Sequence, residues 1–195
     1  MSKTLDVYLS FSSPFSYLAQ TQLAALAERT QCDIAYHVID LRKIWEFTGN
    51  PGPIDVAAKF NYLVKDVGDW CRHYNVPLNR PSRFPMNNRP ASAGAAIAQK
   101  AGNLPEYIDR VMRAYFVEDQ DIADPQVLGK LGAEIGLDAD AVVAGVTDAA
   151  ILQEVDANAE AAAKRGVFGV PTFFIGDDMY WGNDRLIFVE EALKR

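Results

Sequence analysis

The sequence predicts an α/β fold in which a long helical segment separates the strands. Strand-like runs lie near the two ends of the 195-residue chain, and the middle has only helical periodicity. Hydrophobic residues make up 49% and charged residues 23% of the chain, the balance of an ordinary globular protein with a buried core. We therefore expect a single sheet built from both ends of the chain.

The N-terminal segment predicts a strand, a helix and a second strand. Residues 5–10 are an apolar run with β-branched and aromatic members. Ser13 is a good N-cap and Pro14 suits the first helical turn, so a helix is expected over 15–29. A second strand at 34–39 completes a βαβ unit with a parallel pair of strands.

The middle of the chain has helical patterns and no convincing strand. Between Ile54 and Tyr74 apolar residues recur at spacings of three and four, as on one face of an amphipathic helix. Further segments with helical patterns are 91–102, 105–118, 126–136 and 149–165. We therefore expect 47–166 to be a helical insertion in a domain formed by 1–46 and 167–195.

Strand character returns near the C-terminus. Residues 171–175 and 179–181 flank the turn signal Gly-Asp-Asp, and together they predict a β-hairpin. Asn183 and Asp184 are expected to cap a last helix over 185–194.

Charge and hydropathy argue against several classes of function. The net charge of −7 disfavours nucleic acid or an anionic membrane as partner, because both require a positive face. No run approaches the roughly 20 apolar residues of a membrane span. Charged residues near the N-terminus also interrupt any signal-like segment.

The cysteines and histidines favour neither a disulfide framework nor a metal site. Cys32 and Cys71 belong to no CxxC pair. A disulfide between them is possible, but two buried free thiols in a reducing cytoplasm fit better, so we expect a cytoplasmic protein. His37 and His73 are isolated in the sequence, and no metal site is visible.

The first segment that could carry chemistry is Ser13-Pro14-Phe15-Ser16, at the start of the first helix. The helix dipole and the free backbone N–H groups stabilise an anion there. Thiol oxidoreductases place a CxxC at such a position because the helix lowers the pKa of a thiol. With serine at both positions the protein cannot exchange disulfides here, but the Ser13 hydroxyl could donate to a thiolate of a ligand. A plain helix cap is the alternative.

Two further segments lie at the same end of the predicted sheet. A cis bond between Val170 and Pro171 would turn the Val170 backbone groups outward, where they could pair with a peptide-like ligand. After Trp181, free N–H groups could bind a carboxylate and Asp184 could accept bonds from an ammonium group. The alternatives are a trans loop proline and an ordinary helix cap.

Together these segments resemble the 2-hydroxychromene-2-carboxylate isomerases and the kappa-class glutathione transferases, which are relatives of bacterial disulfide oxidoreductases. The resemblance is closer to the isomerases and spans nearly the whole chain. The segments that carry it are SPFSYLA at 13–19, GNPGP at 49–53, FGVPT at 168–172 and WGNDRL at 181–186. It implies an α/β, thioredoxin-like fold with a large all-helical insertion.

The resemblance also implies a glutathione-dependent enzyme that interconverts 2-hydroxychromene-2-carboxylate and trans-o-hydroxybenzylidenepyruvate in aromatic catabolism. Ser13 would be the catalytic residue, at the glutathione sulfur. The other implied glutathione contacts are Asn50, Val170, Pro171 in cis, Trp181, Gly182, Asn183 and Asp184. Trp45 and Phe84 could pack on the ring of a small aromatic carboxylate substrate. A homodimer is also implied.

Two alternatives remain open at this point. One is a transferase or peroxidase that uses the same glutathione site on another electrophile, and the other is a non-catalytic peptide-binding module. The carboxylate of the isomerase substrate needs a positive partner. The candidates are Arg42, Lys43, Lys59, Arg80, Arg83 and Arg89.

Overall fold

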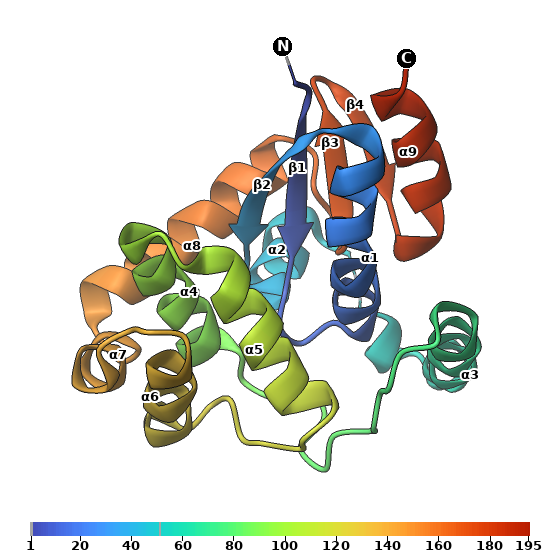
Figure 1. The fold of residues 1–195 in the computed structure, drawn as a ribbon. Helices are drawn as coiled ribbons and strands as arrows, with labels where there is room; N and C mark the ends of the chain where they lie inside the picture. Colours follow the sequence, from blue (N-terminus) through green and yellow to red (C-terminus); the bar gives the residue numbers. More distant parts are fainter. Residues whose placement is uncertain (1, 51) are drawn as a thin grey trace.

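A computed structural model describes residues 2–50 and 52–195, which form a four-stranded sheet with helices on both faces (Figure 1). The strands are β1 (Thr4–Leu9), β2 (Asp33–Val38), β3 (Thr172–Ile175) and β4 (Asp178–Trp181). Their order is β2-β1-β3-β4; β2 runs parallel to β1, whereas β3 is antiparallel to both of its neighbours. The predicted α/β class, the parallel pair and the hairpin are confirmed.

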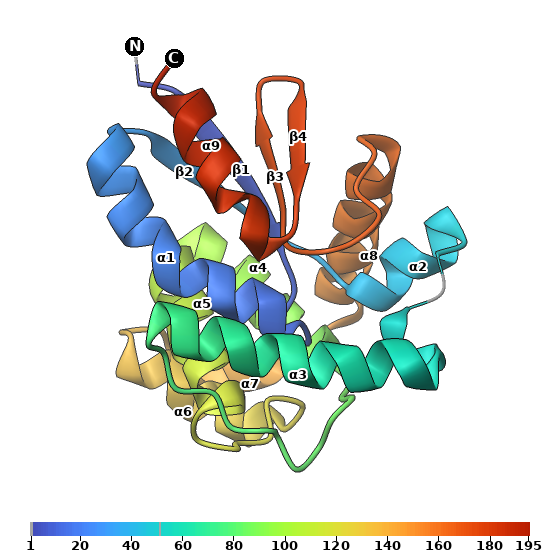
Figure 2. The ribbon, with the colours of Figure 1, turned by 90° about the vertical axis from the view of Figure 1, so that its right-hand side faces the viewer.

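Helices cover both faces of this sheet (Figure 2). They are α1 (Pro14–Thr30) and α9 (Leu186–Leu193) on one face and α2 (Leu41–Thr48) and α8 (Ala149–Lys164) on the other. Successive side chains of a strand point to opposite faces. Accordingly Val7 of β1 belongs to the larger apolar cluster, with α1 and α9, and Tyr8 belongs to the smaller one, with α2 and α8.

The segment between β2 and β3 is helical in its described residues, as the periodicity predicts. It contains α3 (Ala57–Tyr74), α4 (Arg89–Ala101), α5 (Leu104–Phe116), α6 (Pro125–Glu134), α7 (Ala139–Gly145) and the single turn η1 (Pro53–Asp55), in addition to α2 and α8. Helices α4 to α7 gather at one end of the molecule, while α3 stands apart from them and packs against α1 (Figure 1). The larger apolar cluster includes residues of strands and of these helices. The division into a domain and an insertion therefore stays a prediction.

Two helices were not predicted, and the predicted start of the C-terminal helix was wrong. Helix α2 has eight residues and α7 has seven, which is too short for a helical period to stand out in the sequence. Their caps were the available signal, because Asp40 and Asp138 each accept a hydrogen bond from the first turn. Near the C-terminus, Asn183–Arg185 forms a separate 3₁₀ turn, η2, so α9 begins at Leu186 without a side-chain cap.

Both cysteines are free. Cys32 is buried, as predicted, but Cys71 on α3 is only half-buried because it faces a cavity, so its predicted burial was wrong. Within the described ranges, no helix is long and apolar enough to cross a membrane, and no three metal-ligating side chains gather into a cluster.

Candidate active site

Ser13 caps α1 just beyond the end of β1. Its Oγ accepts a hydrogen bond from the Ser16 N–H at 3.2 Å, and its own N–H donates to Ser10 O at 3.1 Å. The cap uses a lone pair of the hydroxyl and leaves its proton available, because a serine hydroxyl has one donor and two acceptor positions. The predicted N-cap is confirmed, and Ser13 retains a donor at the positive end of a helix.

A cavity of about 650 Å³ opens in front of Ser13. Its walls come from α1, α2, α3 and the loop before β3, and they are largely apolar with a few polar groups, the usual composition of a ligand site. The cavity brings together seven of the residues named from the sequence: Ser13, Trp45, Asn50, Lys59, Phe84, Val170 and Trp181.

Packing with neighbours fixes the aromatic walls of this cavity. The Trp45 ring lies so close to Gly52 that a Cβ there would approach it to 2.5 Å, so a larger residue would displace the ring. Trp181 packs on Phe168 with ring centroids 4.9 Å apart. Flat apolar surfaces held in this way suit an aromatic ligand.

The Val170–Pro171 peptide bond is cis, as predicted. Val170 is buried, yet neither its N–H nor its C=O forms a hydrogen bond within the described residues, whereas Gly169 O and Pro171 O both accept bonds. Buried backbone groups are almost always paired. The unpaired donor and acceptor of Val170, on a residue that lines the cavity, therefore fit an amide group of a ligand.

Asn50 supports the same loop. Its Nδ2 donates to Phe168 O at 3.1 Å, which connects the segment after α2 to the residues that lead into the cis bond. Its Oδ1 accepts no hydrogen bond from the described residues and can meet a donor in the cavity, which Asn50 lines.

The segment after β4 lies beside the cavity rather than in it. Apart from Trp181, the predicted residues Pro171, Gly182, Asn183 and Asp184 do not line the cavity. Gly182 has a φ of +104°, a conformation that favours glycine, and a Cβ there would lie 2.4 Å from Asp184 Oδ1, so a larger residue would also displace the carboxylate. The Gly182 N–H donates to Pro171 O at 2.9 Å, and Asn183 is buried with its Nδ2 unpaired.

Sequence reasoning missed the acidic side chain of α3 that lines the cavity, Asp66. Burial, together with the neighbouring carboxylates of Asp69 and Asp184, raises the pKa of Asp66 above its usual value. Asp66 and Asp184 therefore approach each other from α3 and η2. A pair of carboxylates that repel each other in this way provides a site for a ligand ammonium group.

Lys59 is the one cationic side chain that lines the cavity in the described part of the chain, which selects it from the six candidates. Most of the others have partners: Lys43 pairs with Glu46, Arg83 with Asp121, Arg89 with Asp156 and Asp40, and Arg80 lies over the Phe60 ring. Positions 59, 62, 63 and 66 recur at spacings of three and four along α3. That periodicity was the signal that could have identified Asp66 and singled out Lys59 among the candidates.

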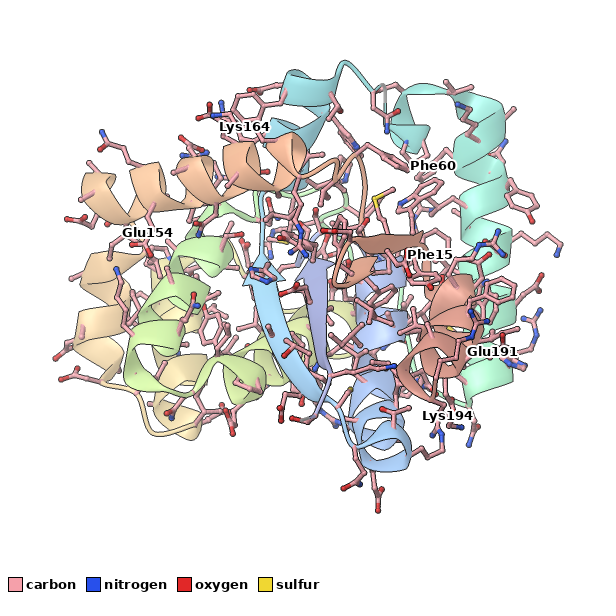
Figure 3. The ribbon with its side chains drawn as sticks, turned by 90° about the horizontal axis from the view of Figure 1, so that it is seen from above. Phe15, Phe60, Glu154, Lys164, Glu191 and Lys194 are labelled. Carbon is pink, nitrogen blue, oxygen red and sulfur yellow. The ribbon has the colours of Figure 1, made fainter. Side chains whose placement is uncertain are left out.

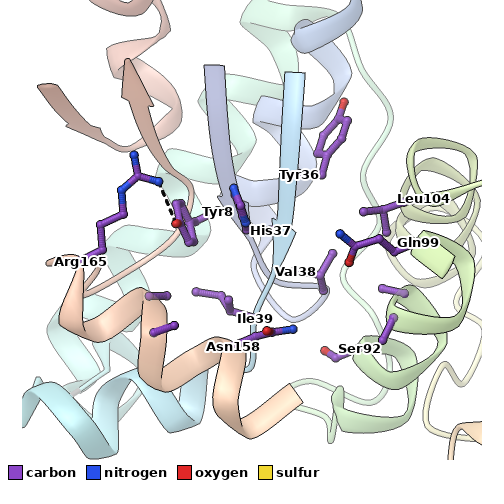
Figure 4. A pocket seen from close by; sticks show the side chains of 14 residues that line it. Tyr8, Tyr36, His37, Val38, Ile39, Ser92, Gln99, Leu104, Asn158 and Arg165 are labelled. Atoms are coloured by element: carbon purple, nitrogen blue, oxygen red, sulfur yellow. Dashed lines mark hydrogen bonds between the residues drawn. The ribbon is translucent and has the colours of Figure 1, made fainter. Parts of the chain in front are cut away.

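A different cavity, of about 310 Å³, lies near β2, α4 and α8 and contains none of the predicted site residues (Figure 4). Its main charged group, Arg165, is already engaged by Tyr8 Oη and Asp6 Oδ2, each at 3.0 Å. Burial opposes the ionisation of Asp6, but hydrogen bonds with His37 and Arg165 hold the pKa of Asp6 below its usual value. These groups satisfy one another's hydrogen bonds and charges, so we interpret them as a structural network.

Known proteins resemble the chain over nearly its whole length. The family model "DSBA-like thioredoxin domain" matches residues 4–194. A 2-hydroxychromene-2-carboxylate isomerase of Sphingobium xenophagum is 36% identical over 195 residues, 99% of each chain. A solved structure of a 2-hydroxychromene-2-carboxylate isomerase has a TM-score of 0.89 and 33% identity, over 97% of this chain and 94% of that one. Glutathione S-transferase kappa 1 of Rattus norvegicus is 22% identical over 94% of this chain and 88% of its own. The predicted thioredoxin-like fold is thus confirmed, and the chain belongs to the DSBA-like thioredoxin domain family and, within it, to the family of the 2-hydroxychromene-2-carboxylate isomerases.

Proposed function

We propose that this protein is a glutathione-dependent isomerase that interconverts 2-hydroxychromene-2-carboxylate and trans-o-hydroxybenzylidenepyruvate. The observation that carries the proposal is the Ser13 hydroxyl, which has an unused proton at the positive end of α1 and lines a largely apolar cavity. The kinship with named isomerases supports the choice of reaction. A homodimer in the cytoplasm is part of the same proposal, and sedimentation velocity tests the dimer.

The residues around the cavity fit the groups of glutathione. The unpaired backbone groups of Val170 would pair with an amide of the tripeptide, next to the cis Pro171. Asp66 and Asp184 would hold the ammonium group of its γ-glutamyl end, near Trp181, Gly182 and the unpaired Asn183 Nδ2. Asn50 would accept a hydrogen bond from the tripeptide. Lys59 is the cation available to a carboxylate in the cavity.

Bound glutathione would supply a thiolate that adds to the conjugated double bond of the ring-opened substrate and leaves after rotation about the resulting single bond. Ser13 donates a hydrogen bond to the sulfur, and the α1 dipole favours the same negative charge. Trp45 and Phe84 pack on the substrate ring and exclude water. No residue of the chain needs to be oxidised or reduced.

The test is an absorbance assay of the purified chain with 2-hydroxychromene-2-carboxylate and glutathione. Conversion to the equilibrium mixture with trans-o-hydroxybenzylidenepyruvate is the expected result. Binding of glutathione without isomerisation, together with conjugation of an electrophile such as 1-chloro-2,4-dinitrobenzene, would instead identify a transferase. Failure to bind glutathione at all would favour the non-catalytic module.

Asp66→Asn is expected to weaken glutathione binding and to raise the melting temperature at neutral pH. The pKa of Asp66 is higher in the folded protein than its ordinary value, so the ionised carboxylate opposes folding at neutral pH, and its removal relieves that cost. The same substitution removes a hydrogen bond to a charged group, which is worth about 1.5 kcal/mol or more, or at least about tenfold in affinity. Calorimetric titration and thermal melts measure the two effects.

Asp69→Asn provides the matched control on the next turn of α3. Asp69 is paired with Lys65 and Arg72, whose hydrogen bonds and charges hold its pKa below the usual value. Its removal should therefore leave glutathione affinity unchanged and should not raise the melting temperature.

The affinity of the wild-type protein for glutathione should also fall as the pH drops toward the raised pKa of Asp66, because an ammonium group needs the ionised carboxylate. Equal glutathione affinity in wild type and Asp66→Asn would show that Asp66 does not hold the ammonium group.

A further inference from the structure

A second cavity, of about 240 Å³, adjoins the active-site cavity between α3 and the chain that leads to α4. Pro14, Leu63 and Phe84 line both spaces, so the two cavities meet at these side chains. Around the second cavity, the described lining residues are apolar or glycine except for Cys71 and Arg80. We call this space the apolar chamber.

The sequence of α3 explains why the two cavities are adjacent. Phe60, Val64, Val67 and Cys71 recur at spacings of four, three and four, so they form one stripe of the helix, and all of them line the apolar chamber. Lys59 and Asp66, one position before Phe60 and Val67, line the active-site cavity instead. Seen from above, α3 with Phe60 lies on the opposite side of the strands from α8 with Glu154 and Lys164 (Figure 3).

We propose that the apolar chamber binds the distal ring of an extended aromatic substrate, one with at least one fused ring more than the bicyclic hydroxychromene. The proposal rests on the proposed function, because the reacting end of that substrate would lie beside Ser13. Because the two cavities adjoin at the three shared side chains, a flat molecule beside Ser13 has only this boundary to cross for its distal ring to reach the apolar chamber.

The size and chemistry of the apolar chamber favour this occupant. An apolar cavity of about 150 Å³ is large enough to hold benzene, so 240 Å³ accommodates a ring with room to spare. A charged or amide-bearing segment would lose its hydration there and find few partners. Phe60 and Phe84 lie nearly parallel, with centroids 6.3 Å apart and 24° between their planes, and offer flat surfaces at the junction. The guanidinium carbon of Arg80 lies over the Phe60 ring, 5.9 Å from the ring centroid.

Cys71 makes the occupant detectable without catalysis. The thiol is half-buried and lines the apolar chamber, whereas Cys32 is buried elsewhere, so N-ethylmaleimide should modify Cys71 first. Anthracene-2-carboxylate at about ten times its dissociation constant should slow this modification roughly tenfold, because only the free protein reacts. Benzoate at the same relative saturation should not protect, since one ring beside Ser13 leaves the apolar chamber empty. Equal rates with and without anthracene-2-carboxylate would overturn the proposal.

Val64→Phe tests the same proposal by turnover. Val64 is 46% exposed, so the larger ring can fill the mouth of the apolar chamber without disturbing the core. The ratio of kcat/KM for a three-ring homologue to that for the bicyclic substrate should fall on the order of tenfold, the value of burying one apolar ring. Asn61→Phe places the same ring on an exposed position of α3 that lines neither cavity and should leave the ratio unchanged.

The two measurements separate the inference from the function on which it rests. If the protein does not isomerise hydroxychromenes, the thiol protection by anthracene-2-carboxylate should persist, because it needs neither glutathione nor turnover. If isomerisation is found but Val64→Phe lowers turnover of both substrates equally, the function stands and the apolar chamber is not a substrate site.

Discussion

Ser13→Ala should lower kcat about tenfold to hundredfold at saturating glutathione while changing glutathione affinity much less. The substitution removes one hydrogen bond to a charged sulfur, worth about 1.5–3 kcal/mol, and each 1.4 kcal/mol is a tenfold change in rate. The groups that would hold the rest of the tripeptide, Val170 and the pair Asp66 and Asp184, are untouched. Steady-state kinetics for turnover and calorimetric titration for affinity measure the two quantities separately.

Two variants distinguish this role from a structural one. Ser13→Ala also removes the N-cap of α1, which costs about 1 kcal/mol of stability, so assays belong well below its melting temperature. Ser13→Thr restores the hydroxyl and the cap and should recover most of the turnover. Ser12→Ala alters the neighbouring serine, which lines the same cavity but does not cap the helix, and should retain kcat. Unchanged kcat in Ser13→Ala, or an equal loss in Ser12→Ala, would contradict the role of Ser13.

The parts of the site that were predictable from sequence are those set by local chemistry. A serine followed by proline after an apolar run specifies both a strand end and a helix cap, and the structure has Ser13 accepting from the Ser16 N–H. The hairpin of β3 and β4 follows in the same way from two short runs around a turn. Such features depend on neighbours in the sequence, so the sequence contains enough to identify them.

The parts that were missed depend on tertiary packing. Asp66 was missed, and Lys59 was only one of six candidates; both lie on an amphipathic helix whose pattern was recognised, but only the packing of α3 against α1 determines which of its faces meets Ser13. The choice among six candidate cations required the lining of the cavity, where Lys59 is the only one of the six in the described part of the chain. At the C-terminal end, the preference of Asn and Asp for helix caps predicted that Asn183 and Asp184 cap the last helix. These residues instead belong to a 3₁₀ turn that precedes it.

The largest effect expected is the loss of all isomerisation after exhaustive dialysis, with recovery when glutathione is added. The argument rests on the thiols of the chain. Cys32 is buried before β2, and Cys71 lines the apolar chamber rather than the cavity of Ser13. With no protein thiol in the active-site cavity, the nucleophile must come from the ligand. Cys71→Ser should behave as wild type in this assay, and full activity of dialysed wild type would contradict the mechanism.

Ser13→Cys tests the same conclusion from the opposite direction. The introduced thiol would stand at the start of α1, where the helix lowers a thiol's pKa, and its thiolate would attack oxidised glutathione, form a mixed disulfide and release one reduced glutathione. Ser16 has no sulfur with which to resolve that disulfide, so no disulfide oxidase should result. Mass spectrometry should detect one glutathionyl group per chain, removable by reductant, also in the background of Cys71→Ser. A variant that catalyses disulfide formation in a reduced protein substrate would show that a second thiol reaches this position, and the dependence on glutathione would then need another cause.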